Sequence, residues 1–170
     1  MNKKQLRGVI FTLLGVTTQL WGQLTYQFEI ELNSKAETML VSQTIEFTNT
    51  SNEALATLYL YDWANSYRGA PSPLANHLAN EFNRSFYITA DSRLGATQIN
   101  TIKASTLREW SRLTEQLDIL KVELNEVLQP GAKLVLALNY QVKIPDDKFT
   151  GIGINSAKRI FLRNLFITVA

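Results

Sequence analysis

Few residues in this chain have side chains suited to catalysis, and they lie far apart. The sequence contains no cysteine and one histidine, His77. A zinc site needs three or four His, Cys or carboxylate ligands at set spacings, so neither a zinc finger nor an HExxH helix is encoded. A Ser-His-Asp triad could use only His77, and no GxSxG motif accompanies it. We interpret His77 as a partly exposed helix residue, and we predict no catalytic, cofactor-binding or metal-binding residue in the chain.

Acidic and glycine residues offer weaker candidates for a site. Glu29, Glu31 and Glu46 lie at alternate, polar positions of expected strands and could line a carboxylate cleft. A solvated sheet surface is the favoured interpretation of all three. The segment Gly151-Ile152-Gly153 is too short for a dinucleotide-binding fingerprint and follows no strand–helix unit, so we interpret it as a loop.

Aromatic residues and two sequence motifs complete the candidates. Trp63, Tyr67 and Trp110 could form a platform on which sugar rings stack, although anchoring in the core or in loops is favoured. Asn49-Thr50-Ser51 and Asn83-Arg84-Ser85 match the N-glycosylation pattern, which often matches by chance.

Alternation of apolar and polar residues predicts the strands that would position these side chains. The expected strands are Leu24–Leu32, Glu37–Thr48, Ala54–Tyr61, Gln98–Ala104, Leu117–Leu124 and a long one over Lys133–Ile144, which Pro145 ends. The first three, joined by short turns, predict an antiparallel meander. Pro130-Gly131 suits a type II turn, and the last two strands are expected to pair around it as a hairpin.

The middle of the chain is less regular. Asp62–Ser72 has the composition of a loop, and Pro73–Phe82 predicts a short amphipathic helix with proline in its first turn. Ser85–Leu113 is ambiguous apart from its one expected strand, and we place Glu109–Arg112 near a turn. The whole pattern predicts a mainly all-β fold, an antiparallel β-sandwich with a short helical insert.

The N-terminus predicts a secretory signal peptide over residues 1–22, followed by one domain over 23–170. Met1–Gly8 is basic, Val9–Trp21 is apolar, and the expected cut lies between Gly22 and Gln23. The apolar run is shorter than the roughly 20 residues that a membrane span needs, so no stable membrane span is expected. A buried helix is the alternative, but a core helix rarely carries all its charge at one end. We therefore expect an exported protein, periplasmic or extracellular.

The charge balance changes when the signal peptide is removed. Taking Lys3, Lys4 and Arg7 from the 17 basic residues leaves 14 against 15 acidic residues, a formal net charge of −1. No clustered basic surface is predicted, so we expect no nucleic-acid partner. The lack of cysteine fits an exported protein that does not use disulfides.

Several motifs follow one another in a distinctive order. The patterns Y-x-x-x-I-x-L, I-x-F-T-N-x-S and L-x-x-L-Y-L-Y come first, followed by L-x-V-x-L, a Pro-Gly turn and a strand that ends in Ile-Pro. Their residues are Tyr26, Ile30, Leu32, Ile45, Phe47, Thr48, Asn49, Ser51, Leu55, Leu58, Tyr59, Leu60, Tyr61, Asn65, Leu120, Val122, Leu124, Pro130, Gly131, Ile144 and Pro145. This order resembles the N-terminal domain of gluzincin zinc aminopeptidases, peptidase family M1, over residues 24–170.

Two further segments are similar to that family. Residues 73–99 resemble a helical insert of its secreted bacterial members. Residues 159–170 resemble the strand that leads to the catalytic domain, with Thr168-Val169-Ala170 where the family has Thr-Pro-Ala.

The resemblance implies a non-catalytic domain of an exported zinc metallopeptidase. Members of the family hold zinc, and hydrolyse peptides, in a later domain that contains HExxH and a downstream glutamate. The implied partner is that catalytic domain, and an apolar patch should be exposed where it docks. One alternative is a stand-alone secreted binding module for a carbohydrate or protein ligand. Another is a small hydrolase that uses His77.

Overall fold

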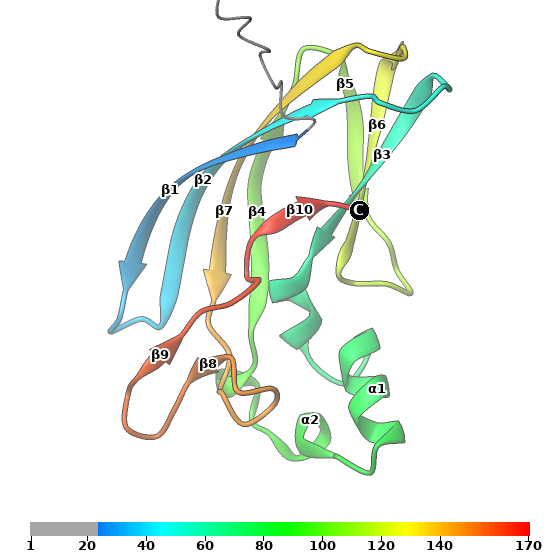
Figure 1. The fold of residues 1–170 in the computed structure, drawn as a ribbon. Helices are drawn as coiled ribbons and strands as arrows, with labels where there is room; N and C mark the ends of the chain where they lie inside the picture. Colours follow the sequence, from blue (N-terminus) through cyan, green and yellow to red (C-terminus); the bar gives the residue numbers. More distant parts are fainter. Residues whose placement is uncertain (1–23) are drawn as a thin grey trace, which may run out of the picture.

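Two four-stranded antiparallel sheets pack face to face in the computed structural model, which describes residues 24–170 (Figure 1). The predicted β-sandwich with a short helical insert is confirmed. The predicted signal peptide and its cut between Gly22 and Gln23 lie outside the described residues.

The described residues form strands, with all the helical segments between β3 and β4. The strands are β1 (Leu24–Asn33), β2 (Thr38–Thr48), β3 (Leu55–Asp62), β4 (Ala96–Lys103), β5 (Leu107–Arg112), β6 (Ile119–Leu128), β7 (Lys133–Lys143), β8 (Gly153–Ile154), β9 (Ile160–Phe161) and β10 (Ile167–Val169). The helical segments are η1 (Trp63–Arg68), α1 (Pro73–Asn80), α2 (Ser85–Ile88) and η2 (Asp91–Arg93).

The first sheet has the order β1-β2-β7-β4 and the second has the order β10-β3-β6-β5. The alternation in β7 is the clearest, because every second side chain enters the core. Its buried residues are Leu134, Leu136, Leu138, Tyr140 and Val142. The facing strands β3 and β6 contribute a matching apolar layer, so the core lies between the sheets.

The predicted hairpin is wrong, and the predicted meander is right only for β1 and β2, since β3 lies in the other sheet. After β2 the chain crosses to the second sheet and forms β3, and after β6 it crosses back to form β7. The chain also changes sheets from β3 to β4 and from β4 to β5, whereas β1–β2 and β5–β6 pair within one sheet. The two crossings lie side by side, since the Asn49 side chain donates hydrogen bonds to the carbonyl oxygens of Leu128 and Glu53, both at 2.8 Å.

Glu109–Arg112 does lie near turns, at residues 105–106 and 117–118, but it forms strand β5, which was not predicted. It pairs with β6 at the edge of the second sheet, with an irregular register between Leu107 and Glu109. Only Trp110 of its central residues faces inward, opposite Val122. An edge strand with so few apolar residues lacks the alternation by which strands are recognised in a sequence.

The helical segments and the β8–β9 hairpin close one end of the sandwich (Figure 1). The helix α1 begins at Pro73 as predicted, and the Ser72 hydroxyl accepts a hydrogen bond from the Ala75 backbone at 3.1 Å. The rings of Phe86 and Phe149 stack at 4.2 Å, which joins α2 to the loop after β7.

Candidate functional site

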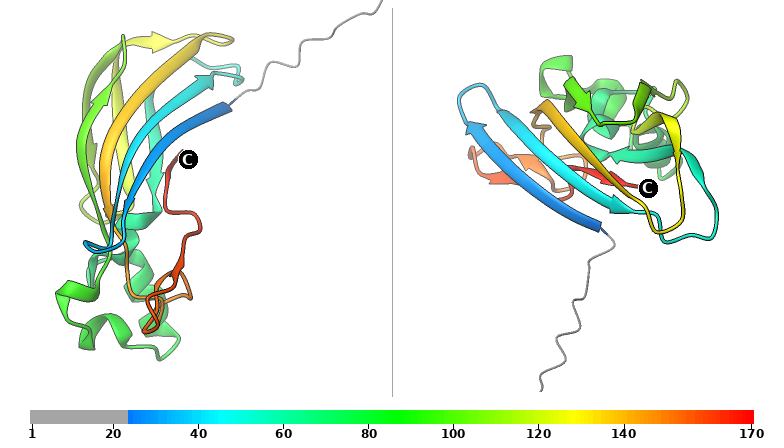
Figure 2. Two further views of the ribbon diagram at one scale, coloured as in Figure 1. Left: turned by 90° about the vertical axis from the view of Figure 1, so that its left-hand side faces the viewer. Right: turned by 90° about the horizontal axis from the view of Figure 1, so that it is seen from above.

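The strand β1 has an apolar face that the second sheet does not cover. Ile30 lies directly opposite Val41 and Leu32 opposite Met39, so these pairs share the inner face of the first sheet. Val41 and Met39 are almost fully buried, whereas the apolar residues of β1 stay between 38% and 47% exposed. We call this surface the inner β1 face: Leu24, Phe28, Ile30 and Leu32. In the view from above, β1 lies at the margin of the molecule, away from β5 and β6 (Figure 2).

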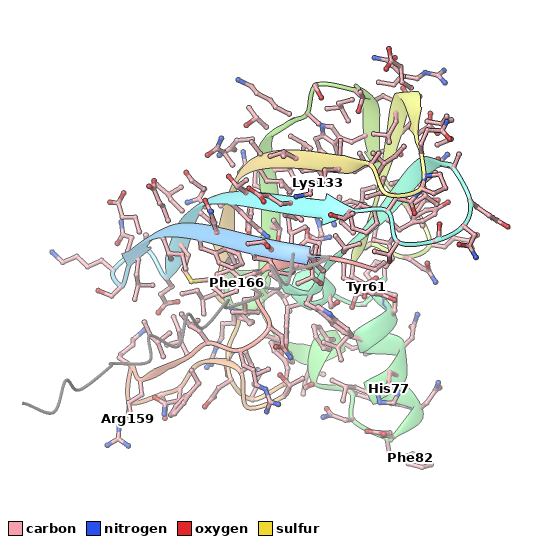
Figure 3. All side chains as sticks on the ribbon, turned by 45° about the horizontal axis from the view of Figure 1, so that its top comes forward. Tyr61, His77, Phe82, Lys133, Arg159 and Phe166 are labelled. Atoms are coloured by element: carbon pink, nitrogen blue, oxygen red, sulfur yellow. The ribbon has the colours of Figure 1, made fainter. Side chains whose placement is uncertain are left out.

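The segment that contains β10 covers part of this surface. The Phe166 ring lies 4.7 Å from the Phe28 ring, and the Val169 backbone donates to the Tyr26 hydroxyl at 3.0 Å. Figure 3 shows Phe166 close to β1. Ile30 and Leu32 lie beyond this contact and are the most exposed residues of the face. The sequence predicted a strand with one wet face, but β1 is solvent-accessible on both of its faces.

The acidic residues considered as a carboxylate cleft lie on solvated sheet surface, as favoured by the sequence analysis. Glu29 and Glu31 are exposed on the outer face of β1, and Glu46 is exposed on β2. Each is at an alternate position that points away from the core. No ion pair of these three carboxylates with a described residue is present.

An aromatic row lies on the outer face of the second sheet. Tyr59 and Tyr61 occupy alternate positions of β3, and Trp63 follows at the next one. The three are 45%, 38% and 46% exposed. The rings of Tyr61 and Trp63 stack at 6.0 Å with an interplanar angle of 29°. We call these three residues the aromatic row.

The aromatic trio considered in the sequence is not brought together. Tyr67 is buried, and its hydroxyl lies 2.7 Å from the Thr150 hydroxyl. Trp110 is half-buried on the inner face of β5. Trp63 alone is exposed, and its neighbours in space are tyrosines of β3. Aromatic residues at positions 59, 61 and 63 alternate in the sequence, and this alternation indicates one exposed face. The sequence prediction instead grouped Trp63 with Tyr67 and Trp110.

A buried ion pair within the second sheet lies near η1 and is hydrogen-bonded to the first sheet. The Asp62 carboxylate is almost fully buried and lies 2.7 Å from the Arg112 guanidinium. The Thr97 hydroxyl of β4 donates to the same carboxylate at 2.6 Å. Burial raises the pKa of Asp62, against the lowering effect of Arg112 and of the Thr97 hydroxyl. Because all of these groups are satisfied by one another, we interpret the cluster as a fastening between the sheets rather than a reactive site.

His77 has no catalytic neighbourhood among the described residues. Its side chain is 68% exposed, as predicted, and its Nε2 lies 3.4 Å from the Glu81 carboxylate on the same helix. Figure 3 shows His77 at the helical end, apart from Tyr61 and Phe166. This isolation gives no support to a hydrolase that uses His77.

The remaining motifs have structural roles. A Cβ atom at Gly153 would lie 2.1 Å from the Pro145 carbonyl oxygen, so this glycine permits a close backbone contact rather than a phosphate cradle. Asn49 is fully buried and its amide is engaged, which leaves its glycosylation motif inaccessible in the folded chain. The Asn83 side chain accepts a hydrogen bond from the Ser85 backbone at 3.0 Å.

Comparison with known proteins adds no further constraint. No protein-family model and no curated protein matches this chain. Within residues 24–170, no three His, Cys, Asp or Glu side chains gather where they could hold a metal ion, and none of the described helices could cross a membrane. We take the inner β1 face and the aromatic row as the candidate sites, because both expose apolar side chains to solvent.

Proposed function

We propose that this chain is the non-catalytic N-terminal domain of an exported zinc aminopeptidase, and that its inner β1 face docks against the catalytic domain. The order of motifs that resembles family M1 supports the identity of the enzyme. The exposure of an apolar face in continuity with the core supports the docking, and it is the observation on which the proposal depends. In this role the domain walls one side of the substrate cleft, while zinc and peptide chemistry belong to the later domain.

The energetics of the face favour a covered state. Fully burying a Leu, Ile or Phe side chain contributes about 1.5–3 kcal/mol. Four such side chains of the inner β1 face still expose 38–47% of their surface. Covering them would contribute on the order of 1 kcal/mol each. A flat, apolar sheet surface of this kind is typical of a contact between domains.

Reading the gene beyond codon 170 tests the identity of the enzyme. A downstream frame that encodes HExxH and a later glutamate would support the proposal. A stop codon followed by an unrelated gene would contradict it.

Dye binding tests the docking surface separately. Residues 24–170 should bind a hydrophobic dye, and the double variant Ile30→Ser, Leu32→Ser should bind clearly less, because it removes the apolar contact area. The matched control is Leu40→Ser, whose side chain is 47% exposed on the outer face of β2. Equal dye binding by the double variant and the wild type would count against a docking role for the inner β1 face.

The aromatic row favours a second candidate function, a secreted module that binds carbohydrate. Exposed aromatic rings aligned along a strand offer flat, apolar faces for stacking with sugar rings. On a glycan array, Tyr61→Ala and Trp63→Ala should lose binding, whereas Tyr87→Ala, an isolated and 53% exposed tyrosine of α2, should retain it. An array without any wild-type signal would rule out this function for the glycans tested.

A further inference from the structure

A cleft on the outer face of the first sheet contains cationic side chains and no carboxylate in its wall. The cleft lies where β2, β4 and β7 meet the end of η1, and its volume is about 450 Å³. Volumes of this size accommodate small organic molecules. The wall is made mainly by strand residues that point away from the core, with Ala36 of the β1–β2 turn, Thr97 and Arg68, the last residue of η1.

The two cations of the cleft lack an ionic partner among the described residues. No carboxylate lies within 4.0 Å of the Arg68 guanidinium or of the Lys143 ammonium. The Lys143 Nζ donates to the Asp91 backbone oxygen at 2.8 Å, which holds the ammonium in place without neutralising it. The nearby Glu37 carboxylate is paired with Lys158 at 2.7 Å.

Neutral hydrogen-bonding groups stand beside these cations. Gln98 of β4 lies directly opposite Gln141 of β7, and neither side-chain amide has a partner among the described residues. Thr38 of β2 lies opposite Lys143 in the same row. The amides and the hydroxyl can each donate a hydrogen bond to an oxygen atom of a ligand.

Acidic residues on the same sheet face lie outside the cleft. Glu31 is opposite Leu40, which is in turn opposite Gln141, so it is two strands away. Two strand spacings amount to about 10 Å, roughly the distance over which solvent and salt screen an exposed charge.

We propose that this cleft binds a small multivalent anion with phosphate or carboxylate groups, held by the Arg68 guanidinium and the Lys143 ammonium and oriented by the amides of Gln98 and Gln141. Phosphate and carboxylate groups share this chemistry, since both accept charge-assisted hydrogen bonds from guanidinium and ammonium groups. The proposal is independent of the proposed docking function, because the inner β1 face is on the opposite side of the sheet.

Calorimetric titration of residues 24–170 with pyrophosphate, and separately with succinate, tests the proposal. At least one probe should bind, and the binding should weaken as salt is added. Tighter binding of pyrophosphate would assign a phosphate ligand, and tighter binding of succinate a dicarboxylate. Failure of both probes to bind at low salt would overturn the proposal.

Substitutions locate the binding. Arg68→Gln and Lys143→Gln should each weaken it by about tenfold, the typical effect of losing one charged hydrogen bond. Lys103→Gln makes the same change of charge at the far, exposed end of β4 and should leave binding unchanged. Equal loss in all three variants, or no loss in Arg68→Gln, would show non-specific attraction and overturn the site. Backbone amide shifts of Gln98 and Gln141 on titration provide a readout that does not depend on the variants.

Discussion

At the residue scale, the ion pair of Asp62 and Arg112 is the most consequential contact of the core. Removing the cation leaves a carboxylate that is 1% exposed without its charge partner. We predict that Arg112→Ala lowers the free energy of unfolding by about 3–5 kcal/mol at pH 7, the usual cost of breaking a buried pair. Urea denaturation measures this loss. Arg108→Ala on the same strand is the control, because Arg108 is 63% exposed and should cost less than about 1 kcal/mol.

The pH dependence of that variant follows from the direction of the pKa shift. Burial already raises the pKa of Asp62 above its usual 3.8, and loss of Arg112 removes an effect that lowers it. An acid with a raised folded-state pKa adds stability below its unfolded pKa, and this contribution is lost as the pH rises through the folded pKa. The deficit of Arg112→Ala against the wild type should therefore shrink between pH 7 and pH 4. A deficit that grows on acidification would contradict the assigned direction.

At the element scale, β10 depends on side chains of the opposite sheet. The Ile167 backbone donates to the Tyr140 hydroxyl at 3.4 Å, and that hydroxyl donates to the Gln43 side chain at 2.7 Å. Burial raises the pKa of Tyr140, which keeps its hydroxyl protonated and able to donate. Tyr140→Phe should lower the free energy of unfolding by about 1–3 kcal/mol, because the buried Gln43 side chain and Ile167 backbone N–H lose a hydrogen-bond partner. Urea denaturation measures this loss.

A second tyrosine provides the comparison for that variant. Tyr26 accepts a hydrogen bond from the Val169 backbone at 3.0 Å, but both residues are only partly buried. In the variant Tyr26→Phe, a water molecule can accept the hydrogen bond of the Val169 N–H in place of the hydroxyl. The free energy of unfolding should therefore fall by about 1 kcal/mol or less. Equal costs for the two variants would mean that burial does not govern these contacts.

The β8–β9 hairpin is held against the end of β7 by a close backbone approach at Gly153. This glycine has φ +130°, and an added Cβ would meet the Pro145 carbonyl oxygen at 2.1 Å. We predict that Gly153→Ala lowers the free energy of unfolding by at least about 3 kcal/mol, since strain and a steric clash combine. Gly131 has φ +78°, and no atom lies within 4 Å of an added Cβ. Gly131→Ala should therefore lower the free energy of unfolding by only about 1–2 kcal/mol.

The elements differed in how far the sequence could predict them. The strict alternation of β7 and the turn at Pro130-Gly131 are local signals, and both were sufficient. Pairing was predictable only for β1 and β2, because the exchange of strands between sheets involves contacts far apart in the chain, such as that of the Asn49 amide with the Leu128 carbonyl oxygen. The candidate sites show the same limit. Alternation identified the apolar side of β1, but its exposure depends on the short length of β10, the three-residue edge strand of the second sheet.

At the scale of the whole molecule, β1 is a long edge strand with few protective features. It pairs only with β2 among the described strands, in an unbroken register, and it contains neither proline nor lysine. The negative charges of Glu29 and Glu31 are the features of β1 that oppose its pairing with a strand of another chain. The variant Glu29→Gln, Glu31→Gln should therefore self-associate in sedimentation velocity. Glu53→Gln, Glu115→Gln makes the same change of charge in loops and should stay as dispersed as the wild type.

The side-chain contacts of β10 can form only late in the synthesis of the chain. Gln43 donates its amide to the Ile167 carbonyl oxygen across 124 positions of sequence, at 2.6 Å. A ribosome adds about 5–20 residues per second, so roughly 6–25 s separate the synthesis of these two partners. During that interval the Gln43 amide lacks β10, and the Tyr140 hydroxyl, synthesised 27 residues before Ile167, lacks it for the last part. Contacts of such long range also slow folding after synthesis, which makes the nascent chain a long-lived client for chaperones.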